Sequence, residues 1–65
     1  MKIKIWEVRT EKGISLDALS KLTGISKGAL SNYENEKRYP TIDYLERIAK
    51  ALEVNIEELY ESDFQ

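Results

Sequence analysis

The sequence predicts an all-α domain built from five short helices. Apolar residues recur at spacings of three and four, no stretch sustains the alternation of a strand, and capping residues precede four of the five apolar stretches. The 65 residues suffice for one domain, and we assign residues 1–65 to a single unit. A chain of this length buries only roughly 60% of the surface that it exposes when unfolded, so a partner subunit would help to stabilise it.

Gly13 predicts where the first helix stops, and Ser15 predicts where the second helix begins. The first helix is expected over residues 3–12, where apolar residues lie three apart and Gly13 follows as a typical stop. The second helix begins after Ser15, whose hydroxyl can accept a hydrogen bond from a free amide. Leu19 and Leu22 are expected on its buried face, and the helix ends at Leu22 or one residue later.

A tight corner joins the second helix to the third. Gly24 tolerates the positive φ that such a corner requires, and Ser26 caps a third helix over residues 27–34. Two helices joined in this way form a helix-turn-helix, here at about residues 15–34.

The sequence of residues 35–65 predicts a loop followed by two further helices. Residues 35–40 form the loop, because Pro40 has no amide donor and favours extended geometry before it. Asn55 and Glu58 form a capping pair for a short fifth helix, and residues 62–65 are expected to fray. The fourth helix is capped by Thr41 and carries an apolar stripe of Ile42, Leu45, Ile48, Ala49 and Leu52.

Composition excludes several classes of function. The sequence contains no cysteine and no histidine, so thiol chemistry and the commonest metal ligand are both missing. We therefore expect no enzyme, cofactor, metal or small-molecule ligand. Several carboxylates fall at outward spacings with no group placed to tune them: Asp43, Glu46, Glu53 and Glu57.

Hydropathy predicts a soluble, cytoplasmic protein. No apolar run exceeds two residues, which excludes a membrane span, and the N-terminus lacks the apolar core of a signal peptide.

Charge is unevenly distributed along the chain. The net charge is −2, but residues 1–40 hold eight Lys/Arg against five Asp/Glu, a balance of +3, and residues 41–65 hold two against seven, a balance of −5. A one-sided contact with an anion would need such a distribution, although a solvated acidic tail gives the same count.

The third helix has a lightly built outer face. Leu30 and Tyr33 are expected to point inward, which leaves small or polar residues on the opposite side. These outward residues are Lys27, Gly28, Ser31 and Asn32.

The stretch from Leu16 to Tyr33 resembles the Cro and phage-repressor type of helix-turn-helix, the XRE family with a lambda repressor-like fold. The matching positions are Leu19, Gly24, Ile25, Leu30 and Tyr33. The segments "VRTEKGIS", "YENEKRYPT" and "LERIAKALEVNIEELY" extend the resemblance over residues 3–60. The resemblance implies a transcriptional regulator, most simply a repressor, that binds double-stranded DNA in a sequence-specific way.

The resemblance also implies roles for particular residues. The third helix becomes the recognition helix, with base contacts from Lys27, Gly28, Ser31 and Asn32. Backbone contacts are expected from Ser15, Ser26, Asn35, Lys37, Arg38 and Thr41. We expect a homodimer on a pseudo-palindromic operator with half-sites roughly 34 Å apart. The dimer would use the fifth helix and the tail, through Ile56, Tyr60 and Phe64.

Two residues of the first helix are singled out. Arg9 and Glu34 stand at the two positions where members of the resembled family hold a structural ion pair, so the resemblance implies such a pair here. Trp6 lies one position off the inward stripe, and either packs its edge over the fifth helix, which we favour, or joins a dimer contact.

Three positions depart from the family pattern. Leu16 stands where a glutamine usually grips the DNA backbone, and it either packs on the third helix, which we favour, or touches a sugar or a thymine methyl group. Glu36 and Glu53 stand where glycine is common; Asn35 is expected to adopt the left-handed conformation and spare Glu36, whereas Glu53 carries the strain itself.

An alternative function remains open at this point. A small acidic helical domain can use the same surface to hold a peptide or another protein, as an antitoxin-like module with little DNA specificity would. The absence of the expected glutamine at Leu16 favours this alternative slightly.

Overall fold

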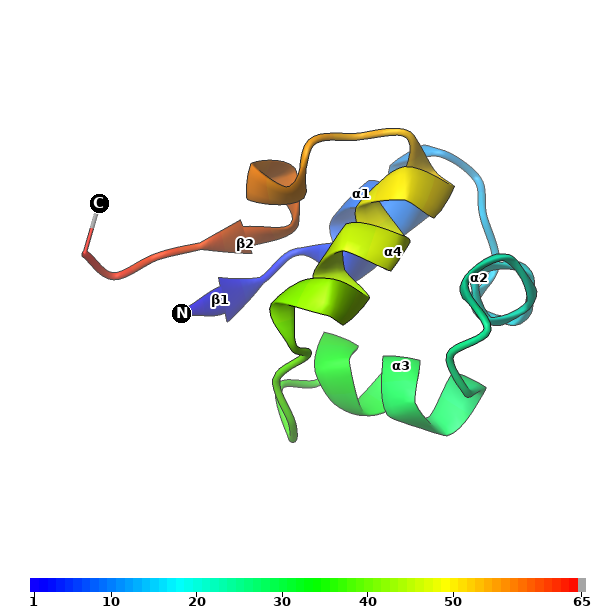
Figure 1. The fold of residues 1–65 in the computed structure, drawn as a ribbon, viewed down its shortest axis with the longest axis horizontal. Helices are drawn as coiled ribbons and strands as arrows, with labels where there is room; N and C mark the ends of the chain where they lie inside the picture. Colours follow the sequence, from blue (N-terminus) through cyan, green and yellow to red (C-terminus); the bar gives the residue numbers. More distant parts are fainter. Residues whose placement is uncertain (65) are drawn as a thin grey trace.

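The computed structural model describes residues 1–64 (Figure 1). Within them, four α-helices and one 3-10 helix surround a common core, and two short strands pair beside it. At 11 residues α4 is the longest of these helices, and none has the length and apolar character of a membrane span. The elements are β1 (Lys2–Ile3), α1 (Ile5–Glu11), α2 (Leu16–Thr23), α3 (Lys27–Glu34), α4 (Ile42–Leu52), η1 (Ile56–Leu59) and β2 (Tyr60–Glu61).

The core collects apolar side chains from almost every element. α4 passes through the middle of the fold and packs against α2 and η1 (Figure 1). α3 packs against α2 and α1 and lies across one side of the domain. The side chains that are almost completely buried are Ile5, Leu19, Leu30, Ile48, Leu52 and Leu59.

The capping predictions for α2, α3 and α4 are confirmed. The hydroxyls of Ser15, Ser26 and Thr41 each accept a hydrogen bond from the amide three residues later, at 3.0, 3.1 and 3.3 Å. Gly24 ends α2 with a φ of 74°. These local signals fix where the three helices begin and how α2 stops.

The prediction of a fifth α-helix is wrong. Residues Ile56–Leu59 form a single 3-10 turn, stabilised where the Asn55 amide donates to the Glu58 carboxylate at 2.9 Å. The helix cannot continue because Tyr60 is extended, with φ −154° and ψ 158°, and enters β2.

The prediction of a first helix over residues 3–12 is also wrong at both ends. α1 covers Ile5–Glu11, and Lys2 and Ile3 pair in antiparallel fashion with Glu61 and Tyr60. The pairing places Ile3 in the core, with 4% of its surface exposed. The domain is therefore mostly helical rather than strictly all-α.

The predictions that Leu22 and Ile42 lie in the core are wrong. Leu22 is 62% exposed because the buried face of α2 is formed by Leu19 and Thr23 instead. Ile42 is 63% exposed because it is the first residue of α4, and the buried stripe begins one turn later at Leu45.

Two glutamates adopt left-handed backbone conformations. Glu36 and Glu53 both have a φ of 58°, whereas Asn35 has a φ of −93°. Asn35 therefore does not spare Glu36, contrary to the prediction, and Glu53 carries the strain as expected. The conformation costs a residue with a Cβ atom about 1–2 kcal/mol.

The variant Glu53→Gly is expected to raise the free energy of unfolding by about 1 kcal/mol, because glycine adopts this conformation without steric cost. The backbone amide of residue 53 still donates to the carbonyls of Ala49 and Lys50. Urea denaturation measures the effect, and Glu46→Gly within α4 should have the opposite sign. A loss of stability in both variants would contradict the strain argument.

Candidate nucleic-acid interface

The corner between α2 and α3 is fixed by side-chain bonds to the backbone. The Ser20 hydroxyl donates to the Ile25 carbonyl at 2.6 Å, and the Thr23 hydroxyl accepts from the Ile25 amide at 3.2 Å. The amide of Gly24 donates to the Ser20 carbonyl at 2.9 Å. Figure 1 shows α2 end-on and α3 lengthwise, so the two helices cross steeply. These bonds make the angle between them a stable feature.

The outward face of α3 is narrow. Leu30 and Tyr33 are buried, as expected, with 0% and 8% of their surfaces exposed. Lys27 and Gly28 are exposed, and Ser31 is half-buried. This face therefore leaves the backbone of the first turn of α3 accessible from outside.

The space beside Gly28 has no role in the packing of the domain. A Cβ atom added there would meet no heavy atom within 4 Å, and Gly28 lies in an ordinary helical conformation. Neither internal packing nor backbone geometry requires glycine at this position. The position is therefore open to whatever approaches α3 from outside.

Lys27 is oriented by a partner that sequence analysis missed. Its Nζ lies 3.1 Å from the carboxylate of Asp17 in the first turn of α2, and the two side chains are 60% and 69% exposed. Opposite charges at the starts of two consecutive helices were the available signal. The pair forms because the first turn of α2, which follows Ser15, lies beside the start of α3.

The far end of α3 holds the loop that follows it. The backbone carbonyl of Asn32 accepts hydrogen bonds from the amides of Lys37 at 2.9 Å and Arg38 at 3.4 Å. Both of these basic side chains are exposed. The half-buried Asn32 uses its backbone for this purpose, and its side-chain amide makes no hydrogen bond within residues 1–64.

Asn35 is engaged with α3 itself. Its side-chain amide donates to the Ser31 carbonyl at 2.9 Å and lies 3.4 Å from the Ser31 hydroxyl. The remaining predicted backbone contacts, Ser15, Ser26 and Thr41, each accept one amide and retain a hydroxyl proton that can be donated. The first turn of α2 and the 35–38 loop thus flank α3 at its two ends.

A buried ion pair ties α1 to the last residue of α3. The Arg9 guanidinium contacts the Glu34 carboxylate through two bonds, Nε–Oε2 at 2.8 Å and Nη2–Oε1 at 3.1 Å. A third bond runs from Arg9 Nη1 to the Ile14 carbonyl at 3.0 Å. The two side chains are only 11% and 8% exposed, so the pair forms part of the interior beneath the candidate surface.

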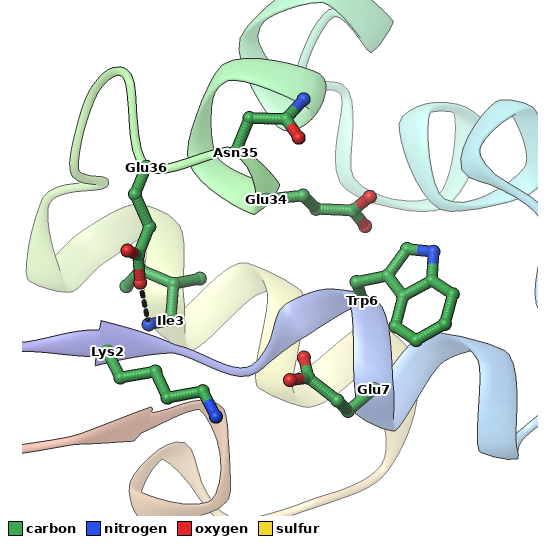
Figure 2. A pocket seen from close by; sticks show the side chains of 7 residues that line it. All are labelled: Lys2, Ile3, Trp6, Glu7, Glu34, Asn35 and Glu36. Carbon is green, nitrogen blue, oxygen red and sulfur yellow. Dashed lines mark hydrogen bonds between the residues drawn. The ribbon is translucent and has the colours of Figure 1, made fainter.

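Leu16 and Trp6, which the sequence also singled out, differ in how they pack. Leu16 is half-buried and packs against the core, and its packing on α3 in particular stays a prediction. Trp6 is 54% exposed and lines a pocket with Glu34 and Glu36, so it faces the end of α3 rather than packing over η1 as we favoured (Figure 2).

The residues expected to form a dimer contact differ in exposure. Ile56 and Tyr60 are half-buried and pack against the domain's own core, whereas Phe64 is 97% exposed. Phe64 is therefore the most accessible apolar side chain of the three.

Comparison with known proteins identifies relatives over most of the chain. A family model described as helix-turn-helix, HTH_3, matches residues 7–59. The transcriptional regulator SinR of Bacillus subtilis is 37% identical over 57 residues, which are 86% of this chain and 51% of SinR. YopS, a prophage-derived uncharacterised transcriptional regulator of B. subtilis, is 41% identical over 85% of this chain and 76% of its own length. The chain thus spans about half the length of SinR.

Solved structures share the fold. The restriction-modification controller protein C.AhdI of Aeromonas hydrophila superposes with a TM-score of 0.83 at 28% identity, covering 88% of this chain and 86% of that one. The N-terminal DNA-binding domain of SinR superposes with a TM-score of 0.81 at 32% identity, covering 95% and 91%. The four α-helices and the matched residues together show that this chain belongs to the HTH_3, XRE-type helix-turn-helix family.

Proposed function

We propose that the protein binds double-stranded DNA in a sequence-specific way and regulates transcription, with α3 entering the major groove. The observation that carries the proposal is the narrow outer face of α3, where Gly28 leaves a space that the domain does not use. Relatives described as transcriptional regulators, and a structural neighbour described as a DNA-binding domain, support it.

Base readout is assigned to the polar side chains of this face. Lys27 donates to guanine O6 or N7, and its exposed ion pair with Asp17 is easily exchanged for such a contact. Asn32 pairs with the N6 and N7 groups of adenine, and Ser31 donates or accepts. Gly28 permits the close approach that these contacts need.

Phosphate contacts are assigned to the two ends of α3 and the adjoining helix starts. Helix N-termini present free amides and the positive end of the helix dipole, which suits an anion. The contributing residues are Ser15, Ser26, Asn35, Lys37, Arg38 and Thr41. Such contacts set orientation and affinity but carry no sequence information.

We further propose a homodimer that represses transcription by covering an operator. One domain makes few phosphate contacts, so two copies on half-sites roughly 34 Å apart bind more tightly. The exposed Phe64, together with the half-buried Ile56 and Tyr60, provides the twofold contact.

Selection from a random duplex pool tests the proposal. We expect enrichment of one short, pseudo-palindromic sequence, and an observed affinity that falls linearly with salt on logarithmic axes. Failure to enrich any sequence, together with binding that does not respond to salt, would refute DNA recognition by α3.

Lys37→Ala is expected to weaken binding to every duplex by a similar factor and to reduce the salt slope by about 1, because one phosphate contact is lost. Fluorescence anisotropy titrations at several salt concentrations measure both quantities. Lys50→Ala removes an equally exposed charge from the last turn of α4 and should change neither. Equal effects of the two variants would indicate a general charge effect and contradict a specific contact.

A further inference from the structure

Glu36 occupies a conformation that glycine would adopt more easily. Its φ is 58°, and its amide donates to the Tyr33 carbonyl at 3.1 Å, so this left-handed residue follows directly on the last turn of α3. A carboxylate beside a proposed phosphate contact also repels the ligand. Two general considerations therefore oppose glutamate at this position.

The side chain of Glu36 makes a contact that glycine could not. Its Oε2 accepts a hydrogen bond from the backbone amide of Ile3 at 2.8 Å (Figure 2). Ile3 lies in β1 and is 4% exposed, and the next residue donates its amide to the Leu59 carbonyl at 2.8 Å. The carboxylate thus covers the amide on the edge of β1, which would otherwise need another acceptor.

The same contact fastens the loop that follows α3. Lys37 and Arg38 come directly after Glu36, and their amides are bonded to the Asn32 carbonyl at the end of α3. The loop is consequently held at two points, to α3 by these backbone bonds and to β1 by the Glu36 carboxylate. Losing either point would allow the two basic residues to move relative to α3.

We propose that Glu36 is a positioning residue for DNA binding, which clamps the 35–38 loop to β1 and so sets where Lys37 and Arg38 meet the phosphates. The inference rests on the proposed function. It accounts for a glutamate that tolerates both backbone strain and an unfavourable charge, because the clamp requires an acceptor that reaches the Ile3 amide.

A comparison of Glu36→Gln with Glu36→Ala tests the acceptor alone. Both variants remove the charge and keep a Cβ atom in the left-handed conformation, but only glutamine offers an oxygen to the Ile3 amide. We expect the Ile3 amide to exchange about tenfold faster in Glu36→Ala than in Glu36→Gln. We also expect Glu36→Ala to bind a labelled mixed-sequence duplex about threefold to tenfold more weakly than Glu36→Gln.

A third variant separates positioning from stability. Glu36→Gly relieves the backbone strain, so its Tm should not fall below that of Glu36→Ala, yet it lacks the acceptor and should bind the duplex as weakly. If the wild-type protein binds the duplex and the Glu36→Gln and Glu36→Ala variants bind it with equal affinity, the positioning role alone is overturned. A wild-type protein that binds no duplex would overturn the proposed function, and the phosphate role of the clamp with it.

Discussion

Arg9→Met is expected to lower the free energy of unfolding by about 3–5 kcal/mol, because it breaks a buried ion pair. The substitution leaves the Glu34 carboxylate 8% exposed and without its guanidinium partner. It also removes the bond from Arg9 Nη1 to the Ile14 carbonyl. Since small domains are marginally stable, much of the protein would unfold at physiological temperature.

Urea denaturation followed by circular dichroism measures this loss. The double variant Arg9→Met/Glu34→Met replaces the pair by apolar side chains and should recover a large part of it, because no buried charge is left alone. Asp17→Asn breaks the exposed pair with Lys27 and should cost less than about 1 kcal/mol. Equal losses in Arg9→Met and Asp17→Asn would contradict the assignment of a buried ion pair.

Asn32→Ala is expected to reduce the preference for the selected operator over unrelated DNA by about 5- to 150-fold, equivalent to about 1–3 kcal/mol. The amide side chain is the one group on the outer face of α3 that can satisfy adenine through two bonds at once. Its removal leaves the phosphate contacts intact, so binding to unrelated duplexes should change little.

Asn32→Ala is also expected to leave the fold of α3 and of the 35–38 loop unchanged. The bonds that hold the 35–38 loop use the backbone carbonyl of Asn32, which alanine retains, and alanine favours a helix more than asparagine. Competitive titrations with operator and mixed-sequence duplexes measure the preference. A uniform loss on both duplexes, like that expected for Lys37→Ala, would show that Asn32 does not read a base.

The helical part of the fold was predictable because its signals are local. Ser15, Ser26 and Thr41 lie next to the helices they cap, and Gly24 supplies a backbone conformation that few other residues adopt. Each of these features depends on neighbours within a few residues. A single sequence contains that information directly.

The strand pair and the Glu36 clamp could not be predicted in this way. Residues 1–5 alternate apolar and charged side chains, but the two-residue strand that pairs Ile3 with Tyr60 is too short for this pattern to separate it from the start of a helix. From residue type alone, Asn35 is a better candidate than Glu36 for the left-handed conformation, because asparagine adopts it more readily than glutamate. The deciding partner, the Ile3 amide, lies 33 residues away.

The candidate interface was predictable only in part. The outward residues of α3 follow from the helical period once Leu30 and Tyr33 face inward. The ion pair of Lys27 with Asp17 depends on how α2 and α3 lie relative to each other. The hydrogen bond from Asn35 to Ser31 depends on the side-chain conformation of Asn35. Their part in contacting DNA stays a proposal.

The pairing of β1 with β2 has a consequence for how the molecule comes apart. These contacts, together with the Met1 ammonium on the Asp63 carboxylate, join segments separated by nearly the whole chain. They close the longest loop in the polypeptide, so the entropy regained on release is larger than for any contact between neighbouring helices. We therefore expect partial opening to begin with the separation of β1 from β2, ahead of the helices, which amide hydrogen exchange measures.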